Sequence, residues 1–319
     1  MESSISSAAL GFGLKYTKIY RDKFGYICAT DNGPVRIQRP EKSRGYSGFN
    51  TADIYFKHEI KELLHKNGLA VGRFLVSSQG TPYFKIGSDC FVATLASNGS
   101  NADFTNDEDF LAVVADVAKM HKILQNFDIS SSKNQAAKTN TAAAKNISTM
   151  AQLKRKLLKS GKFSDFDMLF LKGCEQLLPH AEKYANIPTE YLTKGGYICH
   201  NLLKEENIYK TEDGQMLITN FSETGPGHYL FDLAYLIKRR IKSGAIEIMP
   251  LEKIIETYKK HHNAKNFDIS IFIAILMFPE KFSKISIDYY SKKRTFAPKT
   301  YLKRMEECFK ANEELLKYI

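Results

Sequence analysis

The first hundred residues alternate between apolar and polar positions in a way that predicts β-strands. Residues 16–20, 25–30 and 35–39 have this alternation, and the turn residues Asp31-Asn32-Gly33 lie between the second and the third. Turn formers between two alternating runs are typical of a strand–turn–strand unit. We therefore expect neighbouring antiparallel strands at this end of the chain.

One amphipathic helix is predicted to interrupt the strands at residues 51–68. Apolar residues recur there at helical spacing, and they are Ile54, Phe56, Ile60, Leu63 and Leu64. Gly68 suits the C-terminal cap of this helix. Strand character returns at 74–87 and 89–96, with a turn at Gln79-Gly80. The pattern thus predicts a small α+β lobe.

The rest of the chain is predicted to be mostly helical. Residues 97–106 are polar and rich in turn formers, so we place a hinge there, between a first lobe at 1–96 and a second at 107–319. An acidic start and helical periodicity predict a helix at 107–124. The segment at about 130–148 is low in complexity and is expected to form a loop.

One β-rich segment interrupts the helical part at residues 195–222. It contains the short apolar runs YIC at 197–199 and MLITNF at 216–221, with an Asp213-Gly214 turn between them. A small β-rich lobe with one main helix, a hinge and a larger helical lobe with an embedded hairpin make up the two-lobed, protein-kinase-like α+β fold. This is the fold class that the sequence predicts.

The composition shows a net positive charge but does not identify a specific partner. Hydrophobic residues make up 43% of the 319 residues, which is enough for a sizeable core. The net charge of +11 suits an anionic partner such as a nucleotide, a nucleic acid or an acidic protein surface. The basic runs at 154–159 and 237–242 also suggest a nucleic-acid-binding protein, which is a third hypothesis beside the two given below. We do not favour it, because the sequence contains no recognised nucleic-acid motif.

Cysteines and hydropathy indicate a protein made in the cytoplasm. The five scattered cysteines form no CxxC pair, so they are expected to be reduced thiols. The N-terminal residues lack the pattern of a secretion signal, and the longest apolar run, 271–278, is too short to cross a bilayer. We expect no membrane partner.

The chemistry of a kinase-like fold requires an Asp that accepts a proton, an Asn and an Asp that bind metal, and a Lys that grips the phosphates. In the small-molecule branch the catalytic loop reads His-Gly-Asp, followed by Asn. The segment HNLLKEEN fits both ends of this loop with His200 and Asn207, and it has Leu202 at the position of the catalytic Asp. The strand LITNF puts Asn220 at the metal-binding Asp position. The segment FDLAYL puts Asp232 where an Asp supports the loop.

The phosphate-binding lysine is also missing from its expected strand. Depending on register, Arg36, Gln38 or Arg39 takes its place, and these residues would form a vestigial nucleotide site. Glu59 is the candidate for the acid that anchors such a cation, or it belongs to a solvated helix face. Asn207 likewise has two open readings, as a metal ligand or as a polar cap, whereas His200 is expected to be a scaffold residue.

Four segments of the chain resemble the CotS-type spore-coat family of kinase-like proteins. They are YTKIYRDKFGYICATDNG, FKHEIKELLHKNG, VADVAKMHK and FPEKFSKISIDYYSKKRTFAPKTYLKRMEE. The resemblance implies an aminoglycoside phosphotransferase/choline kinase-like fold. It further implies a protein made in the mother-cell cytoplasm that is then assembled into the spore coat with other coat proteins.

The departures from the catalytic pattern predict a pseudokinase with a structural or interaction role. Leu202 cannot accept a proton, and loss of a general base costs roughly 10²–10⁴-fold in rate. Asn220 lacks the charge that Mg²⁺ prefers in a ligand. We expect no catalytic residues, no metal and no required cofactor. The cleft can still retain ATP, another nucleotide or another small molecule.

The alternative is an active small-molecule phosphotransferase with non-standard catalytic residues. Glu205 and Glu206 lie close in sequence to the lost Asp and would supply a base. Glu223, three residues after Asn220, would supply a metal ligand. An assay of phosphoryl transfer distinguishes the two hypotheses.

Overall fold

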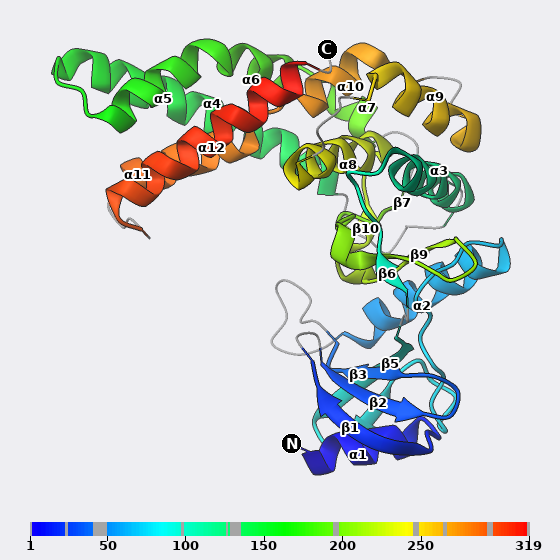
Figure 1. Ribbon diagram of the computed structural model, residues 1–319. Coiled ribbons are helices and arrows are strands. Elements are labelled where there is room, and N and C mark those ends of the chain that lie inside the picture. Colours follow the sequence, from blue (N-terminus) through cyan, green and yellow to red (C-terminus); the bar gives the residue numbers. More distant parts are fainter. Residues whose placement is uncertain are drawn as a thin grey trace. The chain divides into compact units, whose positions relative to one another are not determined.

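The structure is a computed structural model of the chain. It describes residues 2–22, 25–40, 50–96, 99–125, 127, 135–193, 198–244, 249–263, 267–291 and 296–317. The chain divides into two compact units, whose helices and strands are labelled in Figure 1. The first unit comprises Met1–Asp103, Lys122–Leu124 and Leu202–Thr224, and the second comprises Phe104–His121, Gln125–Asn201 and Gly225–Ile319.

The first unit is built on a five-stranded antiparallel sheet in the order β1-β2-β3-β5-β4. Its strands are β1 (Tyr16–Arg21), β2 (Tyr26–Thr30), β3 (Val35–Gln38), β4 (Phe84–Ile86) and β5 (Asp89–Leu95). The three strands predicted before residue 40 are therefore confirmed. The strand predicted at 74–87 is wrong in its first part, because Phe74 makes only a single bridge, to Thr94. The polar residues and Pro82 that follow cannot continue a strand ladder.

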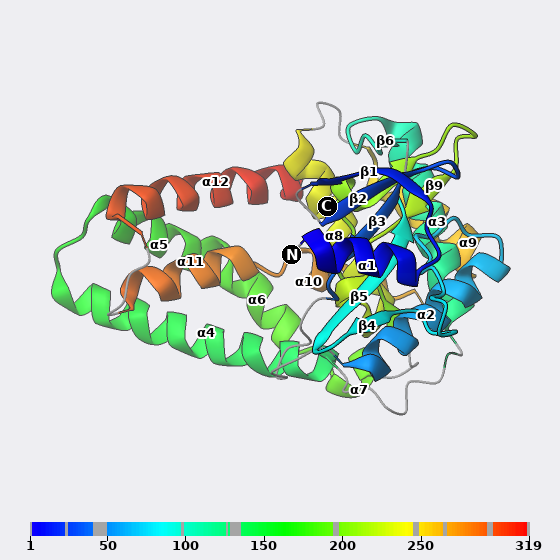
Figure 2. The same cartoon turned by 90° about the horizontal axis from the view of Figure 1, so that it is seen from below.

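Side chains of the sheet alternate between an apolar core and the opposite face. Val35 and Ile37 of β3 are buried, and Arg36 and Gln38 point the other way. Helix α1 (Glu2–Gly11), which the sequence pattern does not predict, packs on the apolar face (Figure 2). Its contribution to this core is Ile5, Ala8 and Ala9, with Phe12 directly after the helix.

Helix α2 (Thr51–Lys66) confirms the helix predicted at 51–68. The Asn50 side chain accepts a hydrogen bond from the Ala52 amide and caps the N-terminus. The buried residues of the helix are Ile54, Ile60, Lys61 and Leu64. Three of these are predicted apolar positions, and the fourth is a lysine.

The hairpin in the helical part of the sequence belongs to the first unit. Strands β6 (Ser100–Asn101), β8 (Ile208–Lys210) and β9 (Met216–Ile218) form a three-stranded sheet, and β8 and β9 flank the predicted Asp213-Gly214 turn. The predicted pairing of 197–199 with 216–221 is wrong. Strand β7 (Ile198–Cys199) pairs instead with β10 (Gly225–Pro226) in the second unit. A two-residue strand has too few side chains for its pattern to specify a partner.

The second unit is helical. Its helices are α3 (Asp107–Leu124), α4 (Gln135–Ser160), α5 (Asp165–Gln176), α6 (Leu178–Ala185), α7 (Thr189–Thr193), α8 (Tyr229–Ser243), α9 (Leu251–His262), α10 (Ile269–Leu276), α11 (Glu280–Tyr290) and α12 (Pro298–Leu316). Figure 2 shows α4, α5, α11 and α12 side by side, and they share one apolar core. Phe170 of α5 and Phe282 of α11 stack in that core with ring centroids 6.0 Å apart.

The prediction of a loop at about 130–148 is wrong from residue 135 onward, where the chain is helical. Helix α4 begins at Gln135 and runs to Ser160. The segment repeats alanine, which has the highest helix propensity, and contains neither glycine nor proline. Low complexity here reflects helix-forming residues rather than a loop. Residues 130–134 of the expected loop lie outside the described residues.

In the described part of the chain, no helix combines the length and the apolar character that crossing a bilayer requires.

Candidate functional site

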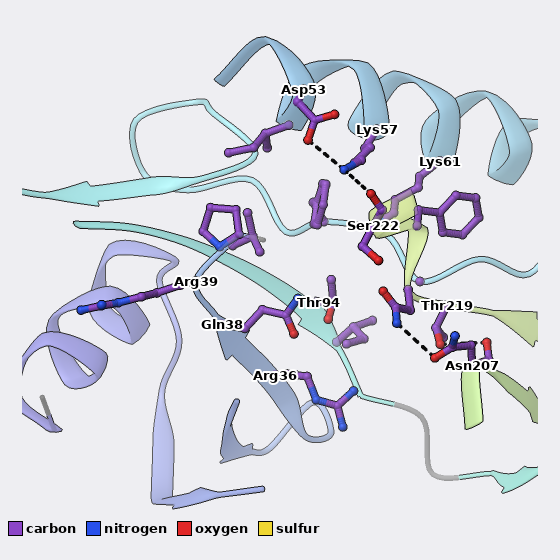
Figure 3. Close-up of a pocket in the computed structure, with 18 of the residues that line it drawn as sticks. Arg36, Gln38, Arg39, Asp53, Lys57, Lys61, Thr94, Asn207, Thr219 and Ser222 are labelled. Carbon is purple, nitrogen blue, oxygen red and sulfur yellow. Dashed lines mark hydrogen bonds and ion pairs between the residues drawn. The ribbon is translucent and has the colours of Figure 1, made fainter. Parts of the chain in front are cut away.

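A cavity of about 290 Å³ lies within the first unit. Strands β3 and β5, helix α2 and the segment from Glu206 to Ser222 form its walls (Figure 3). Its polar and charged lining residues are Arg36, Gln38, Arg39, Asp53, Lys57, Lys61, Thr94, Glu206, Asn207, Tyr209, Thr219, Asn220 and Ser222. The described lining thus brings together six of the twelve positions that the sequence singles out, and His200, Leu202 and Asp232 are not among its residues.

The segment His200–Asn201, which occupies the place of the His-Gly-Asp motif, is anchored by Asp232 at the start of α8. This carboxylate is 1% exposed and accepts hydrogen bonds from the backbone N–H groups of His200, at 2.7 Å, and Asn201, at 2.9 Å. The Nε2 atom of His121 lies 3.1 Å from the same carboxylate. Burial alone would raise the pKa of Asp232, but the hydrogen bond and charge of His121 and the charge of His200 hold it below its ordinary value.

The backbone at Asn201 explains why a glycine suits this place in the motif. Asn201 has φ 61°, in the left-handed region that glycine and asparagine tolerate best. The residue therefore fits the glycine position between His200 and Leu202. The register of the HNLLKEEN segment against the His-Gly-Asp pattern is consistent with this conformation.

The two positions at which the fold would bind metal are hydrogen-bonded to each other. Asn207 donates its Nδ2 to the carbonyl of Leu202 at 2.9 Å, which leaves its Oδ1 facing Asn220. The Nδ2 of Asn220 donates to this Oδ1 at 3.2 Å (Figure 3). The backbone carbonyl of Asn207 also accepts from the amide and hydroxyl of Thr219. Asn207 is 3% exposed, so the polar network around it is largely shielded from water.

These residues do not fit a magnesium ion. Mg²⁺ selects hard oxygen ligands in octahedral geometry and is usually held by carboxylates. The pair at 207 and 220 offers two amide oxygens and no carboxylate, and one of these oxygens, Asn207 Oδ1, already accepts a hydrogen bond from the other amide. Of the carboxylates suggested as replacements, Glu206 lines the cavity, whereas Glu205 and Glu223 are absent from its described lining. Glu206 also lies 3.9 Å from the Lys204 ammonium.

The strand that should carry the phosphate-binding lysine presents Arg36 and Gln38 to the cavity. Arg36 forms an ion pair with Asp22 at 2.9 Å. Arg39 follows the end of β3, and its half-exposed guanidinium pairs with Asp89 at 2.9 Å. Glu59 is exposed on α2 and does not line the cavity, so it does not anchor a cation there. Its reading as a solvated helix face agrees with this position.

Helix α2 instead presents two lysines to the cavity, Lys57 and Lys61, which are not among the predicted site residues. Lys57 donates to Asp53 Oδ2 and to the Ser222 carbonyl, both at 2.8 Å. Lys61 is 3% exposed, with its Nζ 3.5 Å from the centroid of the Phe74 ring. Burial, followed by the nearby charge of Lys57, lowers the pKa of Lys61 to about 7.

A signal for these lysines exists in the sequence. Asp53, Lys57 and Lys61 are spaced four residues apart, so they form one stripe along the helix. The stripe lies next to the apolar positions Ile54 and Ile60. A charged stripe at the edge of a buried face is one place where a helix can direct polar groups into a site.

A second polar cluster lies in the core of the second unit. His121, Cys199 and Asp232 place potential metal-ligand atoms within 4.8 Å of one another, and all three are buried. The atoms of this cluster are already engaged, since His121 Nδ1 lies 2.8 Å from the Tyr258 hydroxyl and Asp232 holds the backbone at 200–201. Burial raises the pKa of Cys199 well above its ordinary value, which opposes the thiolate that a metal needs. The cluster is structural.

Comparison with known proteins identifies the fold. No protein-family model and no curated protein matches the sequence. An aminoglycoside phosphotransferase from Alicyclobacillus acidocaldarius superposes with a TM-score of 0.79 at 17% identity, over 98% of this chain and 93% of that one. The AMP-bound spectinomycin phosphotransferase APH(9)-Ia gives 0.64 at 12% identity, over 99% and 98%. Choline kinase LicA from Streptococcus pneumoniae gives 0.53 at 14%, over 99% of each chain.

The chain therefore has the fold of the small-molecule phosphotransferases. This fold is the aminoglycoside phosphotransferase/choline kinase-like form of the two-lobed kinase-like α+β class, as the sequence predicts. At these identities the similarity establishes the fold alone.

Proposed function

We propose that this chain is a catalytically inactive member of the phosphotransferase fold class, a pseudokinase with a structural or interaction role. The observation that carries the proposal is the hydrogen bond from Asn220 Nδ2 to Asn207 Oδ1 at 3.2 Å. In a metal-dependent enzyme two oxygens would face each other here and need a cation between them. The amide N–H of Asn220 satisfies Asn207 without one.

The loss of the base acts on the same reaction. Leu202 is half-buried, and its backbone carbonyl accepts a hydrogen bond from the Asn207 side chain. An aliphatic side chain neither accepts nor orients a proton, and the base is worth roughly 10²–10⁴-fold. Without the metal, the charge on the transferring phosphoryl group is also left without its main stabilisation. Both losses support a fold retained for something other than turnover.

We assign the role to the spore coat on the resemblance of four segments of the chain to CotS-type proteins. On this hypothesis the chain is made in the mother-cell cytoplasm and then joins other coat proteins. The assignment is tested by fusing a fluorescent protein to the chain in an endospore-forming host and imaging sporulation. Signal that forms a shell around the forespore and is extracted with the coat supports the role. Diffuse signal that stays in the mother cell contradicts it.

The catalytic proposal is tested by measuring ATP hydrolysis and phosphate transfer to aminoglycosides and choline, with Mg²⁺, Mn²⁺ or Ca²⁺. We expect no turnover by the unmodified chain. Kinases of this chemistry typically reach about 1–100 s⁻¹, so transfer in that range ends the proposal. A Leu202→Asp/Asn220→Asp double variant tests the reason: a gain of metal-dependent ATP hydrolysis would identify these two positions as the ones lost.

Glu206 provides the specific control for an active enzyme with non-standard residues. It lines the cavity together with Asn207 and Asn220. If the unmodified chain transfers phosphate, Glu206→Gln should abolish the activity under this second hypothesis. Glu205→Gln, whose side chain is outside the described lining, is the matched control.

A further inference from the structure

Lys61 carries an ammonium group into a shielded site that supplies no counter-ion in the described part of the chain. The side chain is 3% exposed and lines the cavity. Its Nζ lies 3.5 Å from the Phe74 centroid and 5.4 Å from the Phe221 centroid, and within the described residues it makes no hydrogen bond or ion pair. Aromatic faces attract a cation but do not neutralise it. A buried ammonium in this state favours either the loss of its proton or the arrival of an anion.

Lys57 extends the same site by one helical turn. Its side chain is 12% exposed, and the ammonium donates to Asp53 and to the Ser222 carbonyl. An ammonium has three donors, so among the described residues one N–H of Lys57 remains for a ligand. Because Lys57 and Lys61 are four residues apart, both project from the same face of α2 (Figure 3).

The ion pairs around the cavity leave one of its basic side chains unbalanced among the described residues. Arg36 pairs with Asp22, Arg39 with Asp89 and Lys57 with Asp53. Lys61 is the described basic lining residue without an ion pair, so its charge calls for an anion when it is protonated. A phosphoryl group carries negative charge on several acceptor oxygens, which Lys61 and the remaining N–H of Lys57 can share.

We propose that this cavity binds a phosphoryl dianion without metal, through Lys61 and Lys57. Helix α2 would thereby supply the phosphate-binding cation that β3 lacks. The inference deepens the proposed function and rests on it in one respect, that the site no longer performs catalysis. It names a metal-independent ligand where an active enzyme of this chemistry would bind its nucleotide together with magnesium.

The size of the cavity and its polar network favour a compact ligand. About 290 Å³ lies at the lower end of the range for small-molecule sites, roughly 300–1,000 Å³. Lysine binds phosphate as a point charge and does not require the planar fork that arginine provides. The Asn207–Asn220 pair offers no carboxylate to magnesium, an ion that would compete with the lysines for the phosphoryl oxygens. Inorganic phosphate and pyrophosphate are therefore the appropriate probes, with ATP in EDTA as the larger source of the same group.

The test is calorimetric titration of the full chain with phosphate, pyrophosphate and ATP in EDTA, repeated with excess Mg²⁺. We expect binding of at least one probe without metal, and no strengthening by Mg²⁺. Lys61→Met should weaken that binding at least tenfold. Lys66→Met, an exposed lysine on the same helix, is the matched control and should leave it unchanged. Acetate at the same ionic strength should not bind.

A second readout reports the Lys61 ammonium directly. Since the pKa of Lys61 is about 7, close to half of the molecules carry the proton at pH 7, and an anion should draw in up to about half a proton. Titration in buffers of different ionisation enthalpy measures the net proton exchange, and because phosphate itself exchanges protons near pH 7, the uptake by Lys61 is the difference between the unmodified chain and Lys61→Met. Equal affinities for the two chains, a requirement for Mg²⁺, or equal proton exchange by the two chains would each overturn the inference.

The two proposals fail separately. Absence of phosphate binding refutes the proposal of a phosphoryl ligand. It does not affect the pseudokinase proposal, which the transfer assay tests. Phosphate transfer by the unmodified chain refutes the pseudokinase, whatever the titrations show. Misfolding does not confuse the result, because removing a buried charge should make Lys61→Met more stable than the unmodified chain.

Discussion

Replacing Lys61 with methionine should stabilise the protein, and the gain should shrink as the pH rises. Methionine has similar length and needs no counter-ion, so it removes the cost of burying an ammonium and keeps the contact with Phe74. The pKa of Lys61 is lowered from 10.5 to about 7 in the folded chain. The unfolded chain therefore binds more protons between these two values, and stability rises with pH across that window.

The magnitude follows from the two pKa values. Linkage gives a cost of about 4 kcal/mol at pH 7 and about 2 kcal/mol at pH 9, and it disappears above the unfolded pKa. The attraction of the Phe74 ring for the charged form returns up to about 2 kcal/mol. We therefore expect the advantage of Lys61→Met over the unmodified chain to fall by about 1–2 kcal/mol between pH 7 and pH 9.

The assay is urea denaturation at pH 7, 8 and 9, followed by circular dichroism, with the free energy of unfolding compared between variants. Lys66→Met is the control, since this exposed lysine on the same helix should show a difference that does not depend on pH. A difference between Lys61→Met and the unmodified chain that stays constant from pH 7 to pH 9 would refute the reasoning. It would mean that Lys61 remains fully charged in the fold.

Three further substitutions test how the loop and the core are held. Asp232→Asn should destabilise the protein by roughly 2–4 kcal/mol in urea denaturation, because an amide cannot accept from both backbone N–H groups at 200–201 and also pair with His121. Asn201→Gly should change stability by less than about 1 kcal/mol, whereas Asn201→Val should cost more than that, since φ is 61° there. Gly173→Ala should lower the melting temperature through a loss of roughly 1–3 kcal/mol, because its Cβ would lie 2.2 Å from the Phe282 ring.

The fold class is predictable from the sequence because the signals that carry it are local. Helix α2 and the strands β1, β2 and β3 follow from periodicity, and the Asp213-Gly214 turn identifies the hairpin. These elements are long or have distinctive turns, so tertiary contacts need not decide their type. Their order then matches the fold of the phosphotransferases to which the chain is structurally similar.

The errors occur where local pattern and long-range contact disagree. Helix α1 has a weak, alanine- and serine-rich pattern and is held by its packing on the sheet. Strand β7 has only two residues, and its pairing with β10 depends on where the chain returns 26 residues later, from Cys199 to Gly225. The first part of α4 is low in complexity, and complexity carries no information on helix propensity.

The missed lysines show why the site was harder to predict than the fold. A motif comparison directs attention to Glu59, the residue type that an active enzyme would use. Side chains two positions apart on a helix lie about 200° apart, so a helix that presents Lys57 and Lys61 to the cavity must turn Glu59 toward solvent. Burial of Ile54, Ile60 and Leu64 in the core fixes the rotation of α2 about its axis. Their positions in the sequence therefore predict which residues of the helix face the cavity.

The lysines and the altered metal positions are two parts of one change in charge. A magnesium site contributes positive charge and needs carboxylates around it, which would pair with any ammonium placed nearby. At 220 the chain has a neutral amide instead, hydrogen-bonded to the Asn that the motif keeps at 207, and the carbonyl of the nearby Ser222 accepts from Lys57. With no acidic ligand for metal at 220, the positive charge on α2 remains available to a phosphoryl group. If Asn220→Asp in the otherwise unmodified chain drew Lys57 or Lys61 into an ion pair, metal-independent phosphate binding should fall, and this link between the two halves of the site can be measured.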